Sequence, residues 1–464
     1  MADLWTSQEI AAATGGRVDG GDFAVNGVSI DTRSLETGDL FVALAGARDG
    51  HEFVPQARAS GAAGVLATRA VDAPAVIVED TLKALEMLGI AARERAPQVR
   101  RGAVTGSVGK TSVTQAVRAG LARAGRAHSS IKSYNNHIGV PLTLARMPRD
   151  TERAVFEIGM NHADEIRPLS RMVRPHAVAI TTVGPVHVEN FPDGEHGVAL
   201  AKAEIFEGIE PGGLAILNAD NRWFDLLKAE ALKAGATVAS FGSIESADAR
   251  LLEFRLAGEG AVIRASLHGE AVEFPILQSG FHWGPNSLAA ILMLEALGVS
   301  RADALGSLGA FAPLAGRGAE IQVRLPGGAF TLVDESYNAN PVSMAAAFAS
   351  LGARRPEGRR IVALTDMLEL GVEAPAFHAA LAEPIAAAGV DLVFCAGPLM
   401  KSLWDALPST RRGGYAETAG ALAPEIARAV KPGDVVMVKG SNGSKAGVVA
   451  TALSTIGVVP GETG

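Results

Sequence analysis

The expected fold is decided by the stretch Ala103-Val104-Thr105-Gly106-Ser107-Val108-Gly109-Lys110-Thr111-Ser112. An apolar run leads into a loop with two glycines, and a lysine follows where a helix can begin. Glycines let backbone N–H groups converge on an anion, and the helix offers the positive end of its dipole. This strand–loop–helix pattern is typical of α/β proteins that bind a nucleoside triphosphate.

Lys110 and Thr111 carry the chemistry that this loop offers. A lysine at this place can reach the outer phosphates of a nucleotide, and the Thr111 hydroxyl can bind Mg2+. The loop lacks the first glycine of the general pattern, because Val104 stands there. An ordinary glycine-rich turn with an exposed lysine is therefore an alternative. The residues predicted to bind the nucleotide here are Gly106, Ser107, Gly109, Lys110, Thr111 and Ser112.

The composition is that of a multidomain protein. The chain has 464 residues, of which 48% are hydrophobic, so length predicts about three domains. A net charge of -8 indicates no broad basic face and argues against general nucleic-acid binding. The single cysteine, Cys395, lies in an apolar run typical of a buried strand, which fits a reducing compartment. No run reaches the about 20 apolar residues of a membrane span, so we expect a cytoplasmic protein.

Short apolar runs alternate with helix-like segments along most of the chain, which predicts an α/β fold with mainly parallel sheets. The predicted strands include 64–67, 75–78, 154–157, 177–181, 215–217, 361–364, 392–394 and 434–438. Residues 238–274 alternate without convincing helices, and we expect an antiparallel insert or edge there. Linker-like punctuation near residues 80–100 and 311–318 divides the chain into three unlike modules.

Glu157 and His187 follow two of the predicted strands. Ligands of open α/β sheets bind where strands end, so both side chains are candidates for a metal site beside Thr111, and His187 is equally a candidate for a phosphate contact. Mg2+ in nucleotide sites generally takes a carboxylate and several waters. The alternatives are a solvated strand-end glutamate and a structural histidine.

Three further features are ambiguous when taken from the residues alone. Lys202 lies on a predicted helix, where an exposed lysine is the simple interpretation. The asparagine-rich segment 133–139 suits a polar substrate, but it can equally be self-capping turn chemistry. The segment 334–341 follows a predicted strand, and its alternative is a strand-to-helix turn ended by proline.

Four ordered motifs together resemble the Mur ligase family of ATP-dependent amide-forming enzymes. They are Gly106-Ser-Val-Gly-Lys110-Thr111, Asn135-Asn136-x-Ile138-Gly139-Val-Pro-Leu-Thr143, Glu157-x-Gly159-Met-Asn161-His162 and Asp334-x-x-Tyr337-Asn338-Ala339-Asn340-Pro341. The resemblance runs from about Ser29 to Lys445 and implies three domains. These are an N-terminal UDP-sugar-binding domain (1–82), a central P-loop ATPase domain (83–312) and a C-terminal Rossmann-like domain (313–464).

The resemblance also implies site residues. The resemblance implies that the catalytic residues are Lys110, Glu157, His187, Lys202 and Arg317. It implies that the metal ligands are Thr111, Glu157, His187 and Lys202. The lysine that matches Lys202 is a carbamate in several relatives. Nucleotide contacts outside the loop are expected from Asn286 on the adenine side, Arg317 at the phosphates, and Asp334, Tyr337 and Asn338. Substrate contacts are expected from Ser29, Asp31, Arg33, Gly46, Asn135, Asn136, Asn161 and His162.

The segment 334–341 is similar to the family branch that joins D-alanyl-D-alanine to UDP-N-acetylmuramoyl-tripeptide. This implies a monomeric ligase of peptidoglycan precursor synthesis that uses ATP and Mg2+ and passes through an acyl phosphate. Alternatives are a sister amide ligase, a folylpolyglutamate-type ligase, a nucleotide-switch binding protein or an inactive scaffold. The third peptide residue and the proton acceptor stay open. Asp164 stands where the family pattern has glycine, so its effect on the cleft is open too.

Overall fold

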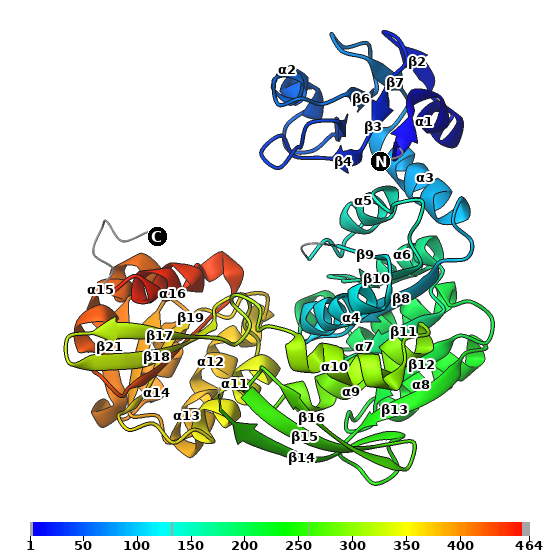
Figure 1. Ribbon diagram of the computed structural model, residues 1–464. Coiled ribbons are helices and arrows are strands. Elements are labelled where there is room, and N and C mark those ends of the chain that lie inside the picture. The colour runs from blue at the N-terminus through cyan, green and yellow to red at the C-terminus, as the bar shows by residue number, and fades with distance from the viewer. Residues whose placement is uncertain (1–2, 131–132, 259, 457–464) are drawn as a thin grey trace.

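The computed structural model describes residues 3–130, 133–258 and 260–456. Three modules follow one another along the chain, each built on its own sheet (Figure 1). The N-terminal module lies above one end of the central module, and the C-terminal module lies beside the central one. The α/β class and the three-module organisation predicted from the sequence are confirmed.

The N-terminal module has a five-stranded sheet in the order β2-β7-β6-β5-β4, in which only the β2–β7 pair is antiparallel. A two-stranded ribbon, β1-β3, lies beside it. The elements are β1 (Trp5–Thr6), α1 (Ser7–Thr14), β2 (Arg17–Asp19), β3 (Ala24–Val25), β4 (Gly27–Ser29), β5 (Asp39–Val42), η1 (Gly50–Phe53), α2 (Val54–Ala59), β6 (Gly64–Ala67), β7 (Ala75–Ile77) and α3 (Thr81–Glu94).

The central module has a nine-stranded sheet in the order β16-β15-β14-β13-β12-β11-β8-β10-β9. Its elements are β8 (Arg100–Thr105), α4 (Lys110–Ala124), β9 (Ala127–Ser129), α5 (Gly139–Ala145), β10 (Arg153–Glu157), α6 (Ile166–Val173), β11 (Ala177–Ile180), η2 (Val188–Asn190), α7 (Glu195–Ala203), η3 (Glu204–Gly208), β12 (Leu214–Asn218), α8 (Phe224–Lys233), β13 (Thr237–Gly242), β14 (Ala249–Ala257), β15 (Gly260–Leu267), β16 (Glu270–Ile276), α9 (Trp283–Ala296) and α10 (Arg301–Ala310).

The C-terminal module has a six-stranded sheet in the order β17-β18-β22-β19-β20-β21, parallel except at β17. Its elements are β17 (Ala319–Leu325), β18 (Gly328–Glu335), α11 (Pro341–Gly352), β19 (Arg360–Thr365), η4 (Gly371–Glu373), α12 (Ala374–Ala380), α13 (Ala382–Ala387), β20 (Leu392–Ala396), α14 (Met400–Ala406), η5 (Ser409–Arg411), β21 (Arg412–Ala416), α15 (Ala419–Ala429), β22 (Val435–Lys439), η6 (Asn442–Ser444) and α16 (Ala446–Ser454). Cys395 is buried in β20, as its apolar run predicted.

Helices cover both faces of the central and C-terminal sheets. In the central module α4, α9 and α10 pack on one face, and α5, α6, α7 and α8 pack on the other. In the C-terminal module α11 to α14 cover one face, and α15 and α16 cover the other. Parallel strands buried on both faces explain why the sequence shows continuous apolar runs rather than strict alternation. In these parallel strands, polar side chains gather mainly at the strand ends.

The predicted strands are present, with bounds that differ by a residue or two. The expected antiparallel edge is also present, because β14, β15 and β16 form an antiparallel meander. Its predicted start is early, since β13 still pairs in parallel with β12. The meander forms one edge of the sheet, and β8 lies among the parallel strands between β11 and β10, whose carboxyl ends are where ligands of such sheets bind.

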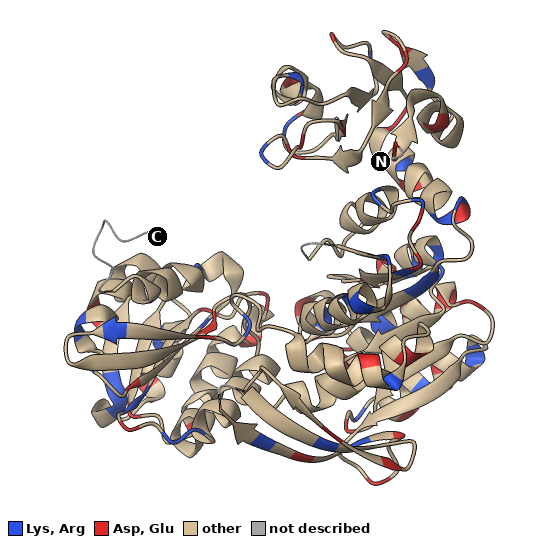
Figure 2. Cartoon of the chain, viewed as in Figure 1, with Lys and Arg blue, Asp and Glu red and all other residues tan. Residues whose placement is uncertain are grey.

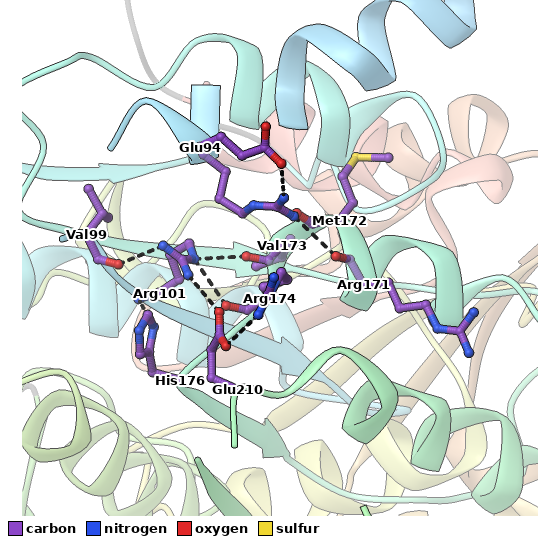
Figure 3. Close-up of polar contacts among 10 residues, drawn as sticks. Glu94, Val99, Arg101, Arg171, Met172, Val173, Arg174, His176 and Glu210 are labelled. Atoms are coloured by element: carbon purple, nitrogen blue, oxygen red, sulfur yellow. Dashed lines mark hydrogen bonds and ion pairs between the residues drawn. The ribbon is translucent and has the colours of Figure 1, made fainter. Parts of the chain in front are cut away.

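Arginines at the start of β8 serve the fold. Arg101 donates to Val173 O at 2.9 Å and Arg174 O at 3.1 Å, and so caps the carboxyl end of α6 (Figure 3). Its guanidinium also pairs with Glu210 at 3.3 Å. Arg93 from α3 donates to Met172 O at 2.7 Å. Cations at a helix carboxyl end are stabilising. The guanidinium groups of Arg93 and Arg101 thus donate to other parts of the protein itself.

Figure 2 shows Lys and Arg residues interspersed with Asp and Glu residues along all three modules. Among the described residues, no helix combines the length and apolar character that crossing a membrane requires.

Candidate active site

The loop between β8 and α4 is shaped by two glycines with positive φ. Gly106 has φ +149°, and a Cβ there would lie 2.0 Å from Thr181 Oγ1. Gly109 has φ +88° and forms the turn into α4. The close approach of β11 and the left-handed turn each exclude a side chain. The strand–loop–helix interpretation is confirmed, and the amino end of α4 faces the pocket described below.

Lys110 is turned inward. Its Nζ donates a 2.7 Å hydrogen bond to Gly106 O within the loop. Burial lowers the pKa of the Lys110 ammonium below its ordinary value; nearby Glu157 opposes this shift and Arg317 adds to it. The loop therefore holds a cation that has one backbone acceptor, and an anion in the pocket would supply stronger acceptors.

Glu157 ends β10 and is 1% exposed. Its Oε1 accepts hydrogen bonds from Ser133 Oγ at 2.9 Å and Asn135 Nδ2 at 2.7 Å. Its Oε2 is buried and, among the described residues, has no hydrogen-bond partner. Burying a carboxylate oxygen without a partner is costly, so this atom is suited to contact a cation bound in the site. The described residues contain no group of three His, Cys, Asp or Glu side chains that could hold a metal alone.

His187 lies in the loop between β11 and α7, in a left-handed backbone conformation with φ +59°. Its Nδ1 lies 3.0 Å from Oε2 of Glu369 in the C-terminal module. Burial lowers the pKa of His187 to about 4, and Lys110 and Lys202 add to that shift. The imidazole is therefore neutral near pH 7, the form that binds metals.

Lys202 is buried in α7 and is not the exposed helix lysine that its spacing alone allowed. Burial lowers the pKa of its amine well below the ordinary value, and Lys110 contributes to the shift. In the part of the chain that the structure describes, its amine makes no hydrogen bond or ion pair, and the residue is 3% exposed. A buried lysine without an acidic partner is unusual. The lowered pKa of Lys202 favours the neutral, nucleophilic amine.

A pocket of about 350 Å³ lies between the central and C-terminal modules. Of the predicted residues it is lined by Ser107, Gly109, Lys110, Thr111, Ser112, Asn135, Glu157, Asn161, His187, Asn286, Arg317, Tyr337 and Asn338. The predicted residues outside its lining are Gly106, Asn136, His162, Lys202, Asp334 and the N-terminal set Ser29, Asp31, Arg33 and Gly46. The structure thus brings together most of the predicted nucleotide and metal residues, but not the predicted N-terminal substrate residues.

The C-terminal module contributes a cation and an aromatic ring to this pocket. The Arg317 guanidinium lies 4.0 Å from the centre of the Tyr337 ring, and its Nη2 donates to Thr111 Oγ1 at 3.1 Å. Asp334 accepts hydrogen bonds from the backbone N–H groups of Gly316, at 3.0 Å, and Ser336. Asp334 therefore shapes the loops that carry Arg317 and Tyr337.

The predicted substrate residues outside the pocket make local contacts. Ser29 is buried and donates to Asp31 O at 3.1 Å, and Arg33 pairs with Asp31 at 2.6 Å. Asn136 caps the start of α5 by accepting from Gly139 N at 2.9 Å. His162 lies 3.2 Å from Glu165.

Asp164 occupies the glycine-like position with φ +66°. Its carboxylate is 73% exposed and pairs with Arg167 at 2.7 Å. Its backbone N–H donates to Glu204 at 2.7 Å. The side chain is outside the pocket lining, so it departs from the glycine pattern without entering the cleft.

Lys439 is a pocket residue that the sequence reasoning missed. It ends β22 and is 2% exposed. Its Nζ donates to Glu335 Oε2 at 3.2 Å and to Asn338 O at 3.0 Å. The signal that could have found it is its place at the end of an apolar strand, the criterion that selected Glu157. Ser133 and Glu335 also line the pocket; both belong to segments that the sequence singled out, but neither was predicted as a site residue.

Family patterns match most of the chain. Residues 24–106 match the pattern described as Mur ligase family, catalytic domain, residues 104–294 match the Mur ligase middle domain, and residues 321–442 match the Mur ligase, glutamate ligase domain.

Relatives and solved structures are similar over nearly the whole length. The UDP-N-acetylmuramoyl-tripeptide--D-alanyl-D-alanine ligase of Escherichia coli (strain K12) is 35% identical over 84% of this chain and 86% of its own. The enzyme of the same name from Bacillus subtilis (strain 168) is 33% identical over 91% of each. A crystal structure of MurF from Acinetobacter baumannii has a TM-score of 0.85 at 28% identity and covers 97% of this chain and 98% of its own.

Proposed function

This chain belongs to the Mur ligase family, and we propose that it joins D-alanyl-D-alanine to UDP-N-acetylmuramoyl-tripeptide at the expense of ATP. The product is UDP-N-acetylmuramoyl-pentapeptide, a precursor of peptidoglycan, and ADP and phosphate are released. The named relatives support the substrates. The observation that carries the chemistry is the shared pocket, in which Lys110, Glu157 and Arg317 come from two modules.

The reaction has two steps. The terminal carboxylate of the tripeptide attacks the γ-phosphorus of ATP, so that a C–O–P bond forms and ADP leaves. The amine of D-alanyl-D-alanine then attacks the acyl carbon, phosphate leaves, and the amine loses a proton. Both reactants of the first step are anions, so Lys110 and Arg317 must neutralise charge while the two modules align the groups and exclude water.

The residues present fit a Mg2+ ion. The unpartnered Glu157 Oε2 supplies a carboxylate ligand, and Thr111 and His187 supply a hydroxyl and a neutral imidazole. We propose that Lys202 completes the set as a carbamate, since the side chain is buried and its lowered pKa favours the neutral amine that reacts with CO2. Free amine and CO2 would give the carbamate and a proton. When bound, the ion would offset the negative charge of the phosphates.

The remaining site assignments are proposals on the same basis. Asn286 at the start of α9, Tyr337 and Asn338 would hold the nucleotide. Asn135, Asn136, Asn161 and His162 would hold the peptide end of the substrate. Ser29, Asp31, Arg33 and Gly46 would hold the UDP end on the N-terminal module. We further propose a monomer that acts in the cytoplasm, where ATP is available.

The test is Mg2+-dependent phosphate release from ATP, with the UDP-muramoyl tripeptide and D-alanyl-D-alanine supplied singly and together. We expect release only with both, and UDP-muramoyl pentapeptide as the product in mass spectrometry. Release with a single amino acid in place of the dipeptide would indicate a sister ligase. Release indifferent to either substrate would indicate a nucleotide switch and would reject the proposal.

A further inference from the structure

The loop of residues 182–190, here called the bridging loop, is tied to the phosphate-binding loop by Ser107. Ser107 N donates to Thr182 O at 2.8 Å, Ser107 Oγ donates to Gly184 O at 3.1 Å, and Gly184 N donates to Ser107 Oγ at 3.0 Å. A serine hydroxyl has one proton to donate, and Gly184 takes it. Ser107 is thereby committed to the bridging loop, although its position in the motif suggests a phosphate contact.

The C-terminal module also contacts the bridging loop. Glu369 lies 3.0 Å from His187 Nδ1. A Cβ at Gly184 would lie 2.7 Å from Cγ2 of Val342 in α11, and a Cβ at Gly371 would lie 3.1 Å from Glu189 Cβ. The bridging loop is therefore enclosed between the phosphate-binding loop and the C-terminal module.

Glu369 is held where it is by the module behind it. It has φ +63°, a left-handed conformation that is unfavourable for a non-glycine residue and needs support from its surroundings. The preceding residues give that support, because Met367 N donates to His378 Nε2 and Leu368 N donates to Ser441 Oγ, both at 3.0 Å. These hydrogen bonds fix the backbone that places the Glu369 carboxylate, which is 60% exposed, beside His187.

We propose that Ser107 and Glu369 are positioning residues for His187, Ser107 by fixing the bridging loop to the phosphate-binding loop and Glu369 by contacting the imidazole from the C-terminal module. A histidine that binds a metal generally sets its other ring nitrogen against a carboxylate or carbonyl. With Nδ1 facing Glu369, Nε2 is left for the pocket. His187 then takes its working orientation only while the C-terminal module lies against the bridging loop. This inference rests on the proposed function for its consequence, but the contacts themselves can be tested apart from it.

The first test is amide hydrogen exchange of residues 182–190 in the nucleotide-free protein. Ser107→Ala and Glu369→Ala should each raise exchange in the bridging loop and leave the core of α9 unchanged. Glu369→Gln, which keeps an acceptor, should stay close to the wild type. Glu373→Ala is the matched control, since it removes an exposed glutamate four residues away. Bridging-loop exchange that is equal in Glu369→Ala, Glu373→Ala and the wild type would overturn the proposal.

The second test is the Mg2+ dependence of phosphate release. Loss of a residue that orients a metal ligand typically weakens metal affinity about 10- to 100-fold, so Glu369→Ala should raise the half-saturating Mg2+ concentration by about that factor, with partial rescue by Glu369→Gln. A fall in kcat alone, with no change in Mg2+ dependence, would reject the positioning role. If the protein shows no ligase activity but the exchange pattern is as expected, the proposed function fails while the contacts stand.

Discussion

The two junctions between modules are held by different kinds of contact. At the junction of the N-terminal and central modules, one hydrophobic cluster contains Trp5 and Leu85 together with Leu142 and Ala145 of α5. The Trp5 indole donates to Ala145 O at 2.9 Å, and the Arg95 guanidinium lies 3.7 Å from its ring centre. Apolar burial contributes about 25 cal/mol per Å², so moving these modules apart would expose core.

At the junction of the central and C-terminal modules, the contacts are polar. Among the described residues, no hydrophobic cluster joins these two modules. Instead, Ser279 of the central module accepts from Arg354 at 2.7 Å and donates its hydroxyl proton to Glu320, and Arg317 donates to Thr111. Polar contacts can be exchanged for contacts with water or a ligand at small net cost. The comparison teaches that one junction is part of the fold, whereas the other is part of the site.

The largest effect is expected at the apolar junction. Trp5→Ala should lower the free energy of unfolding by about 3–5 kcal/mol, because a buried indole is replaced by a cavity. ADP affinity should change by less than about threefold, since Trp5 lies outside the pocket. Urea unfolding and calorimetric ADP titration measure the two quantities, with Trp5→Phe as the milder control. If ADP affinity fell together with stability, the two junctions would not be separable.

Lys110→Ala should give the opposite pattern at the polar junction. Removing a cation aimed at developing charge should reduce turnover by about 10²- to 10³-fold. Stability should not fall, because burial already disfavours the ammonium. Phosphate release and urea unfolding provide the measurements, and Lys228→Ala on α8 is a control lysine. Full ligase activity of Lys110→Ala would remove Lys110 from the mechanism.

Lowering the pH should reduce the free energy of unfolding through His128, which lies next to the apolar junction. His128 Nε2 is 2.6 Å from Thr143 O of α5, the helix that packs at this junction. Burial lowers the pKa of His128 from 6.5 to about 4, so between these values the unfolded chain binds more protons than the folded protein. Stability is therefore full above about pH 6.5 and falls as the pH is lowered toward 4, by up to about 3 kcal/mol. His128→Gln should flatten this part of the stability profile. An unchanged slope in that variant would show that other groups control the acid response.

Asp164→Gly should have the smallest effect. The variant relieves the left-handed backbone at φ +66° but loses the exposed ion pair with Arg167, so the free energy of unfolding should change by less than about 1 kcal/mol. The KM values for all substrates should be unaltered, because the side chain is exposed and outside the pocket lining. A several-fold shift in a KM value would instead place Asp164 at the substrate, and so extend the site beyond the polar junction.

The sequence was most informative where chemistry follows local order. The loop of Lys110 and the strand ends at Glu157 and His187 could be predicted, because a strand followed by a polar residue is visible in a short stretch. The commitment of Ser107 to Gly184 could not be predicted, since it depends on the approach of segments 77 residues apart. The burial of Lys202 and the contact of Glu369 with His187 have the same cause. Pairing between modules is decided by packing, which a single sequence does not display.

The place of Cys395 has a practical consequence. It is the single thiol of the chain, and burial raises its pKa to about 12. At neutral pH only about one molecule in 10⁵ would carry the thiolate that reacts with alkylating probes. Cysteines introduced on the surfaces of two modules could therefore be labelled selectively with the native residue left in place. The distance between two such labels could then be measured spectroscopically across each junction as nucleotide is added.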